Sequence, residues 1–254
     1  MNKPLSHDHI EVGSPYIERV RHDLKRRNLR VEKSQYLTPH MIRVTSSGGA
    51  LDDFTSLSPD DHIKVFLPET NARRDYTPRY FDQEKQQLTL DFAVHEAGPA
   101  TAWALQAKVG DELEIAGPKG SQLIHGDIRH WILIGDTSAL PAIGRRIEGM
   151  TSKDKVTAIV IIPDEADQQQ FLTEADLTIH WITPTIGVSD AQQVMNQLAD
   201  VDLGDKTFVW LAGEHLLIMT LRHFLQYEKG HSKSWMKAAA YWKKGTAEGS
   251  HPIE

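Results

Sequence analysis

The spacing and length of the apolar runs change at about Gly120, and this change limits the folds that the sequence can adopt. Before it, short runs of β-favouring residues follow one another closely, separated by turn formers at residues 46–49 and 58–61. After it, apolar runs suited to burial on both faces alternate with segments of helical character. The first half therefore predicts a small antiparallel β-barrel, and the second predicts a parallel sheet with helices on its faces.

The expected elements follow from this pattern. In the first half we expect strands at residues 30–35, 41–45, 62–67 and 88–94, a helix at 99–108 and a closing strand at 111–116. In the second half we expect strands at 131–135, 156–162, 178–182 and 208–212, with helices at 140–150, 191–198 and 214–227. The boundary should fall near residues 121–129, giving one domain over residues 1–124 and a second over 125–254 that carries a C-terminal extension. The basic segment 19–33 is interpreted as a solvated element before the first strand, with a share in an anion-binding surface as the alternative.

The composition excludes several kinds of chemistry. The 254 residues include no cysteine, so disulfides, thiolate nucleophiles, ordinary iron–sulfur clusters and Cys-based zinc sites are excluded. A net charge of −7 argues against nucleic acid as a partner. No apolar run is long enough to span a membrane and the N-terminal residues are polar, so we expect a cytoplasmic protein. No long apolar patch requires a partner subunit, and we expect a monomer.

The most specific local pattern is the hexapeptide at residues 74–79, Arg-Asp-Tyr-Thr-Pro-Arg. In an extended strand, Arg74 and Tyr76 would lie on one face, and Thr77 and Arg79 on the other. Such a strand could offer a cation and an aromatic ring on one side, and a hydroxyl with a second cation on the other. An edge strand with surface arginines is the alternative interpretation.

A second pattern joins the end of a predicted strand to the start of a predicted helix. His95 is followed by Gly98 and Pro99, which open the helix. Glycine permits close backbone approach, and the free amides of a first helical turn favour a phosphate or pyrophosphate. A structural histidine and an ordinary Gly-Pro helix start are the alternatives.

A third pattern lies between the first predicted strand of the second half and its helix, at residues 134–142. Ser138 is the expected N-cap of that helix, at the carboxyl edge of the sheet where parallel sheets bind ligands. No Gly-x-Gly-x-x-Gly fingerprint is present, so an ordinary strand-to-helix turn is the alternative.

Together these patterns resemble the siderophore-interacting protein family, whose members carry an FAD-binding domain. The resemblance rests on Arg74-x-Tyr76-Thr77-x-Arg79, Asp91-Phe92, His95, Gly98-Pro99-Ala100-Thr101-x-Trp103, the Gly117–Gly120 run, residues 136–142, 212–214 and 241–245. It implies a ferredoxin-reductase-like fold, with a flavin-binding β-barrel and a nicotinamide-binding α/β domain.

The resemblance also implies which residues hold the cofactors. Tyr76 and Thr77 would lie beside the isoalloxazine ring and ribityl chain, with Arg74 and Arg79 near the ring edge and the phosphates. Ala100 and Thr101 would hold the pyrophosphate, and His95 would lie near the adenine. The nicotinamide would approach the flavin between residues 136–139 and residues 212–214. The remaining cofactor-site residues that it implies are Asp91, Phe92, Gly98, Pro99 and Trp103 on the flavin side, and Asp136, Thr137, Ser138, Ala139, Gly213, Glu214 and Trp242 on the nicotinamide side. No catalytic side chain and no metal ligand are implied.

The implied activity is the reduction of Fe(III) in ferric siderophores to Fe(II), releasing iron in the cytoplasm. Electrons would come from NADH or NADPH through FAD, because a nicotinamide gives electrons in pairs whereas Fe(III) accepts one. An open basic pocket would receive the chelate, with Lys64, Lys119 and either Lys243 or Lys244 as candidates. Asp164, Glu165 and Asp167 follow the second predicted strand of the second half and favour NADH over NADPH.

Three alternatives stay open. A ferredoxin could supply the electrons in place of a nicotinamide. The chain could be a general flavin or ferredoxin-type reductase with a protein acceptor, since that two-domain plan is shared. It could also be a non-catalytic siderophore-binding protein, although such a carrier has no need of a pyrophosphate site.

Overall fold

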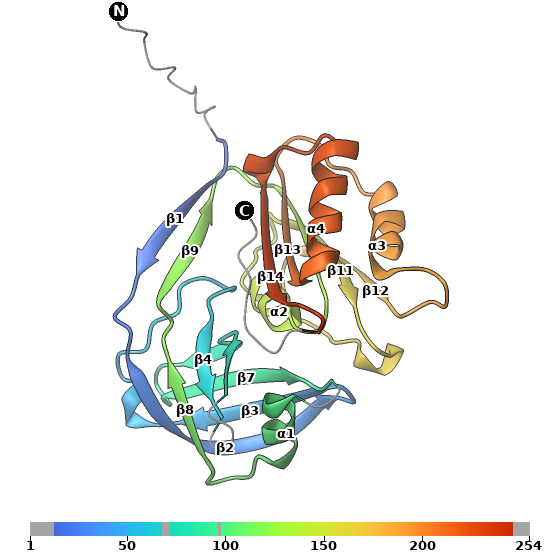
Figure 1. The fold of residues 1–254 in the computed structure, drawn as a ribbon. Helices are drawn as coiled ribbons and strands as arrows, with labels where there is room; N and C mark the ends of the chain where they lie inside the picture. Colours follow the sequence, from blue (N-terminus) through green and yellow to red (C-terminus); the bar gives the residue numbers. More distant parts are fainter. Residues whose placement is uncertain (1–12, 68–71, 96–97, 246–254) are drawn as a thin grey trace, which may run out of the picture.

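The computed structural model of the chain describes residues 13–67, 72–95 and 98–245. Its first half is a curled antiparallel sheet and its second half a parallel sheet covered by helices (Figure 1). The predicted fold class is confirmed in both halves.

The main sheet of the first half has seven strands within the described residues, in the order β5-β4-β8-β2-β3-β7-β6. Their bounds are Arg73–Tyr76 for β5, Ile63–Phe66 for β4, Glu112–Ala116 for β8, Arg26–Thr38 for β2, Met41–Ser47 for β3, Gln87–Ala93 for β7 and Tyr80–Asp82 for β6. The sheet curls until edge strand β5 contacts β7, where the rings of Tyr76 and Phe92 meet. Alternate residues such as Val31, Ile63 and Ile115 are fully buried inside the barrel. Helix α1 (Pro99–Gln106) packs against β7 and β3.

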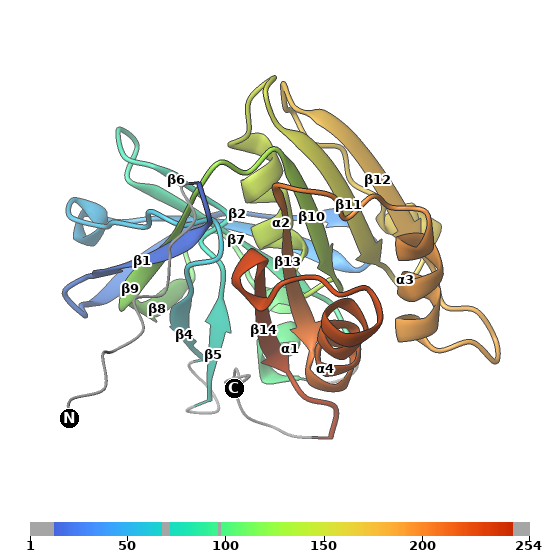
Figure 2. The same ribbon diagram turned by 90° about the horizontal axis from the view of Figure 1, so that it is seen from above.

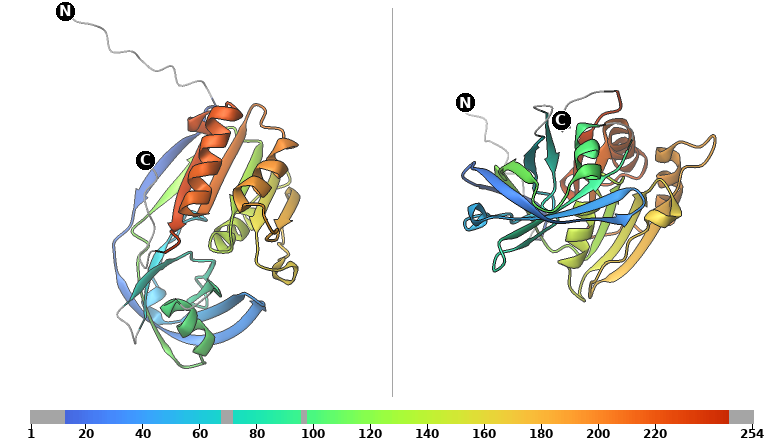
Figure 3. Two further views of the ribbon diagram at one scale, coloured as in Figure 1. Left: turned by 45° about the vertical axis from the view of Figure 1, so that its right-hand side comes forward. Right: turned by 90° about the horizontal axis from the view of Figure 1, so that it is seen from below.

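A two-stranded antiparallel ribbon, which was not predicted, joins the two halves. Strand β1 (Tyr16–Arg21) pairs with β9 (Gly120–His125), and the ribbon runs along both halves (Figure 3). The basic segment at residues 19–33 is therefore the end of β1 and the beginning of β2. Strand β9 lies where the domain boundary was expected, so the change in apolar spacing at Gly120 coincides with the start of the ribbon.

The second half contains five parallel strands in the order β12-β11-β10-β13-β14. Their bounds are Asp176–Ile182 for β12, Lys155–Ile161 for β11, His130–Gly135 for β10, Thr207–Glu214 for β13 and Met236–Trp242 for β14. The first four confirm the predicted strands, whereas β14 was not predicted. The helices are α2 (Leu140–Glu148), α3 (Asp190–Ala199) and α4 (His215–His223), the last continued by a π-helical turn at Phe224–Glu228.

The period of two along each strand gives the parallel sheet two separate apolar faces. On β10, Trp131 and Leu133 pack on the side of α2, whereas Ile132 and Ile134 pack on the side of α3 and α4 (Figure 2). The α2 side also takes in Met41 from the barrel, so one apolar core continues across the junction of the halves. Helix α2 is therefore one of the elements through which the second half meets the barrel.

Within the described part of the chain, no helix is both long and apolar enough to cross a membrane.

Candidate functional site

The predicted flavin strand is shorter than expected. Strand β5 includes Arg74 and Tyr76 but ends at Tyr76, so the alternation of faces expected for residues 77–79 does not apply. Thr77 and Arg79 are both buried, at 7% and 6% exposure. Side chains of helix α2 contact this segment, while the amide of Arg79 donates to the carbonyl of Thr89 on β7 at 2.9 Å.

An aromatic cluster brings the first two sequence patterns together. The ring of Tyr76 lies 4.3 Å from the ring of Phe92, and the ring of Phe92 lies 5.4 Å from that of Trp103, centroid to centroid. Because Trp103 belongs to α1, the strand with Tyr76 and the helix with the Gly-Pro start flank the same buried side chain. Burial raises the pKa of Tyr76 well above its ordinary value, against the opposing effect of Arg74, so its phenol stays neutral.

The beginning of α1 has the features of an anion site. Gly98 is the N-cap in extended conformation, without a side-chain cap, and no acidic residue lies in the first turn. Pro99 has no N–H, and the amides of Ala100 and Thr101 have no acceptor within the helix. A Cβ on Gly98 would lie 3.2 Å from Cε1 of His95, so the glycine lets the exposed histidine ring pack on the backbone.

These residues fit a flavin dinucleotide. The helix start offers amide donors and a partial positive charge for a pyrophosphate, and Tyr76 offers an aromatic surface. Arg74, half-buried at the end of β5, donates to the carbonyl of Arg73 at 2.9 Å and forms no ion pair with a carboxylate in the described residues. Its charge is thus available to a phosphate or to the ring edge.

Three other predicted flavin residues have structural partners. Arg79 donates from both terminal nitrogens to Glu148 of α2, at 2.6 and 2.7 Å. Asp91 is 1% exposed and accepts two 2.7 Å bonds from Arg43. Phe92 is fully buried beneath Tyr76. This geometry does not support the expected contact of Arg79 with the phosphates, because its guanidinium is committed to the junction of the halves.

The nicotinamide-side residues converge on the carboxylate of Asp136. One oxygen accepts from the amide of Ser138 at 2.9 Å and from its hydroxyl at 2.5 Å. The other accepts from the amide of Glu214 at 2.8 Å and from Nε1 of Trp242 at 2.9 Å. The structure thus joins the ends of β10, β13 and β14 at the carboxyl edge of the sheet. The sequence predicted this position for the ends of β10 and β13, whereas β14 was not predicted.

Two local features surround the Asp136 carboxylate: the conformation of Gly213 and the N-cap of helix α2. Gly213 has φ of +150°, and a Cβ there would lie 2.6 Å from Oδ2 of Asp136, so only glycine fits. The predicted N-cap role of Ser138 is wrong, because its hydroxyl donates to Asp136 and Ala139 occupies the N-cap position of α2. Ala139 is fully buried and Thr137 is half-buried.

The charges around Asp136 are mixed. Glu214 caps α4 by accepting from the amide of Leu217 at 2.9 Å, and it accepts from the amide of Lys244 at 3.3 Å. The pKa of Asp190 is raised, mainly by burial. The negative charge of Asp136 raises it further, whereas the positive charge of Lys244 lowers it. Lys244 is therefore near the predicted nicotinamide site as well as being a candidate for the substrate pocket.

The predicted substrate lysines differ in their surroundings. Lys64 forms an ion pair with Asp75 across β4 and β5, at 2.7 Å. Lys119 follows β8, the strand that pairs with β4, and is exposed. Lys243 and Lys244 are exposed after β14. The structure leaves their common role a prediction, since the charge of Lys64 is already partly neutralised.

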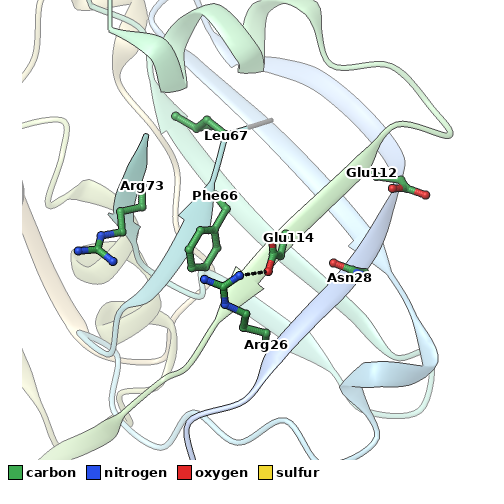
Figure 4. A pocket seen from close by; sticks show the side chains of 7 residues that line it. All are labelled: Arg26, Asn28, Phe66, Leu67, Arg73, Glu112 and Glu114. Atoms are coloured by element: carbon green, nitrogen blue, oxygen red, sulfur yellow. Dashed lines mark hydrogen bonds and ion pairs between the residues drawn. The ribbon is translucent and has the colours of Figure 1, made fainter. Parts of the chain in front are cut away.

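A hollow of about 510 Å³ lies beside Phe66 of β4, between Arg26 and Arg73 (Figure 4). Phe66 lies two residues after Lys64 on the same face of β4. The guanidinium of Arg26 lies 4.3 Å from the centre of the Phe66 ring and donates to Glu114 at 2.9 Å, while Arg73 lies on another side of the ring. Among the described residues that line the hollow, the charges are two arginines and two glutamates, so its described lining is not predominantly basic.

Sequence reasoning missed a buried polar cluster at the junction of the halves. Asp60 accepts from Nζ of Lys237 at 2.5 Å and from Nε1 of Trp210 at 3.1 Å, and Arg146 lies 3.4 Å away. Burial alone would raise the pKa of Asp60, but Lys237 and Arg146 outweigh it and hold the pKa well below its ordinary range. No local signal marks these partners, because they lie far apart in sequence.

The acidic loop after β11 also has structural tasks. Asp167 is 2% exposed and accepts from the amide and Nδ1 of His40 at 2.8 and 2.7 Å. Asp164 caps a short 3-10 helix by accepting from the amide of Ala166. Asp164 and Glu165 stay exposed, whereas the charge of Asp167 is used by His40, so the preference for NADH stays a prediction that rests on two acidic residues.

Comparison with known proteins agrees with this arrangement. A family model described as a siderophore-interacting FAD-binding domain matches residues 30–73 and 70–122, and one described as siderophore-interacting protein matches residues 128–245. The NADPH-dependent ferric-chelate reductase of Escherichia coli is 33% identical, over 89% of this chain and 96% of that protein. Ferric vibriobactin reductase of Vibrio cholerae is 26% identical, over 87% and 91%.

Solved structures give the same picture. A siderophore utilization protein from T. fusca superposes with a TM-score of 0.82 at 29% identity, covering 91% of this chain and 97% of that one. The ferredoxin reductase in carbazole 1,9a-dioxygenase superposes with a TM-score of 0.70 at 17% identity, covering 84% and 66%, which shows the fold alone. The fold is thus ferredoxin-reductase-like, and the chain belongs to the siderophore-interacting protein family.

Proposed function

We propose that this chain reduces Fe(III) in ferric siderophores to Fe(II), with electrons from NAD(P)H that pass through bound FAD. One observation carries the proposal: the same molecule contains two sites of the kinds that the two cofactors need. In the barrel, Tyr76 of β5 lies near the start of helix α1, whose first amides have no acceptor within the helix. In the second half, the loops at the carboxyl edge of the parallel sheet are bonded to the carboxylate of Asp136. The relatives named ferric-chelate reductase and ferric vibriobactin reductase support it.

Each half has a separate task in this proposal. When bound, FAD accepts electrons in pairs and releases them singly, which suits a nicotinamide donor and an iron acceptor. In the barrel, Tyr76 supports the ring, Arg74 stabilises negative charge, and the amides of Ala100 and Thr101 bind the pyrophosphate. In the second half, the edge formed by Asp136, Gly213 and Glu214 orients the nicotinamide. We place the division between the two units at residues 124 and 125.

The ferric chelate would be recognised through its charge. Siderophores hold Fe(III) through hard oxygen ligands that bind Fe(II) less well, so reduction loosens the metal. The exposed cations of Lys119, Lys243 and Lys244 suit an anionic chelate, whereas Lys64 would first have to share its charge with Asp75. The monomeric state, the cytoplasmic location and a ferredoxin as donor stay predictions.

A reconstitution experiment tests the function. Purified protein is loaded with FAD, reduced anaerobically with NADPH or NADH, and mixed with ferric catecholate, ferric hydroxamate or small redox proteins. We expect the flavin absorbance to recover fastest with the ferric chelates. Faster reoxidation by the redox proteins would support a general reductase, and protein that binds no FAD would support a siderophore carrier.

Substitution of Lys119 tests the substrate side. Lys119→Gln is expected to raise KM for a trianionic ferric catecholate by about tenfold, because one favourable charge is lost near the chelate. The effect on a neutral ferric hydroxamate should be smaller, and added salt should reduce the difference. Lys153→Gln, at an exposed lysine of the other half, is the control. Equal KM values for Lys119→Gln and the unmodified protein would remove Lys119 from the site.

A further inference from the structure

The segment that follows the flavin strand is held both by the barrel and from outside it: the amide of Arg79 donates to the carbonyl of Thr89 on β7 at 2.9 Å, and its Nε lies 3.7 Å from Asp91. Both terminal nitrogens of Arg79 donate to Glu148, at 2.6 and 2.7 Å, and Nη1 of Arg145 donates to the carbonyl of Pro78 at 2.9 Å. Glu148 and Arg145 both belong to the last turn of α2 in the second half. Two successive residues after Tyr76 and Thr77 are therefore fixed by one helix.

The packing of α2 leaves this segment little freedom. A Cβ on Gly144 would lie 3.2 Å from Nη2 of Arg79 and 2.6 Å from Cε1 of Phe171, so the guanidinium lies directly against the helix backbone. Gly144 and Glu148 are four residues apart and share one face of the helix. Arg145 also donates to the hydroxyl and the carbonyl of Ser56, which ties a second barrel loop to the same turn.

The other end of α2 lies at the nicotinamide side. Its N-cap, Ala139, follows the loop in which Ser138 bonds to Asp136, and the amide of Ala139 donates to the carbonyl of Asp136 at 3.0 Å. A helix of this length is a rigid rod of ~13 Å. It therefore links the edge proposed for the nicotinamide directly to the segment proposed for the flavin.

We infer that Glu148 is a positioning residue for the flavin: through Arg79 it fixes Thr77 and the end of β5 in the conformation that binds the isoalloxazine ring. The inference rests on the proposed function, because it assumes that Tyr76 and Thr77 contact FAD. It assigns a role to a side chain of the nicotinamide half in the flavin affinity of the barrel.

A direct role of Arg79 in binding FAD makes the opposite prediction. If the guanidinium bound a phosphate, loss of its partner Glu148 would release it towards the cofactor and leave affinity unchanged or increased. If Arg79 acts as an anchor, loss of Glu148 leaves the segment held only by the contacts of Arg79 with Thr89 and Asp91 of β7, and the looser segment binds FAD less tightly. The two models are therefore separated by the sign of a single effect.

The test is Glu148→Gln in the full-length chain, measured without iron and without nicotinamide. Titration of apoprotein with FAD, followed by fluorescence, is expected to give a Kd about tenfold higher, since a charge-assisted bidentate pair is lost. At saturating FAD, the visible circular dichroism of the flavin should also change, which general destabilisation would not produce. Glu228→Gln, at an exposed glutamate after α4, is the matched control.

Two further variants keep the test decisive. Arg79→Gln combined with Glu148→Gln should cost no more affinity than either change alone, because both remove the same anchor. Glu148→Asp keeps the charge but shortens the side chain, so it should lower affinity in the same direction, and it replaces Glu148→Gln if that protein does not fold.

The inference is overturned if Glu148→Gln binds FAD as tightly as the unmodified protein, or more tightly, with an unchanged flavin spectrum. Failure to reduce ferric chelates would overturn the proposed function but would leave this result standing. Unmodified protein that binds no FAD would overturn both.

Discussion

Replacement of Asp60 by alanine is expected to lower the free energy of unfolding by about 3–5 kcal/mol, as for other buried ion pairs that lose one partner. The change leaves Lys237 and Arg146, whose side chains are 13% and 9% exposed, without their shared carboxylate. It also removes the acceptor of Trp210 Nε1 and one of the two acceptors of the Ser58 hydroxyl, the other being the carbonyl of Gln122. Urea unfolding followed by circular dichroism measures the loss.

The effect of this substitution should depend on pH. The pKa of Asp60 lies below its ordinary value of 3.8 in the folded protein, because Lys237 and Arg146 outweigh the effect of burial. A carboxylate with a depressed pKa stabilises the fold fully above its unfolded pKa, and this contribution is lost as pH falls through the folded pKa. The difference between the unmodified protein and Asp60→Ala should therefore be constant near neutral pH and narrow below about pH 4.

A matched substitution separates burial from charge. Asp127 pairs with Lys206 on the surface, where both side chains are more than a third exposed, so Asp127→Ala should change stability little. If Asp60→Ala were no more destabilising than this control, the cluster at the junction would contribute no net stability. The rigid connection between the halves would then have to come from the apolar core that includes Met41.

The fold could be predicted from the sequence where the local pattern of apolar residues determines the type of element. The buried runs of β10, β11 and β13 are apolar on both faces, which is typical of central parallel strands, and all were found. The strands that were missed lie at edges or in the ribbon. β1 is almost wholly exposed, β6 has three residues, and β14 contains small residues and a lysine whose burial depends on Asp60. Their stability comes from distant partners, which a local pattern does not contain.

The candidate site divides in the same way. The residues around Asp136 were predicted together, because the loops at the ends of neighbouring parallel strands meet at one edge of the sheet. The position of Arg79 was not, because the motif shows an arginine after a flavin strand but not the glutamate that binds it 69 residues later. Lys237, Arg146 and Glu148 belong to ordinary amphipathic elements, and only tertiary packing distinguishes them from surface charges.

The second large effect is expected at Asp136. Its carboxylate accepts from the amide of Glu214 and from Nε1 of Trp242, and it fixes the loop that carries Ser138. Asp136→Ala removes these charge-assisted bonds, each worth about 1.5–3 kcal/mol, from the edge proposed to orient the nicotinamide. Stopped-flow reduction of the bound flavin by NADPH should show kcat/KM lowered by about 100-fold. Because the barrel contacts of Tyr76 are unaffected, the Kd for FAD should stay within about twofold.

Two comparisons make this result specific to the geometry of the edge. Gly213→Ala keeps the carboxylate but places a Cβ 2.6 Å from Oδ2 of Asp136 at φ of +150°, so it should slow reduction in the same way. Asp200→Ala, at the exposed C-cap of α3, removes a carboxylate from the same half without touching the edge and should react like the unmodified protein. Normal reduction rates in Asp136→Ala would mean that the nicotinamide approaches the flavin elsewhere. Loss of FAD binding in the same variant would mean that α2 transmits the change at Asp136 to the segment after β5.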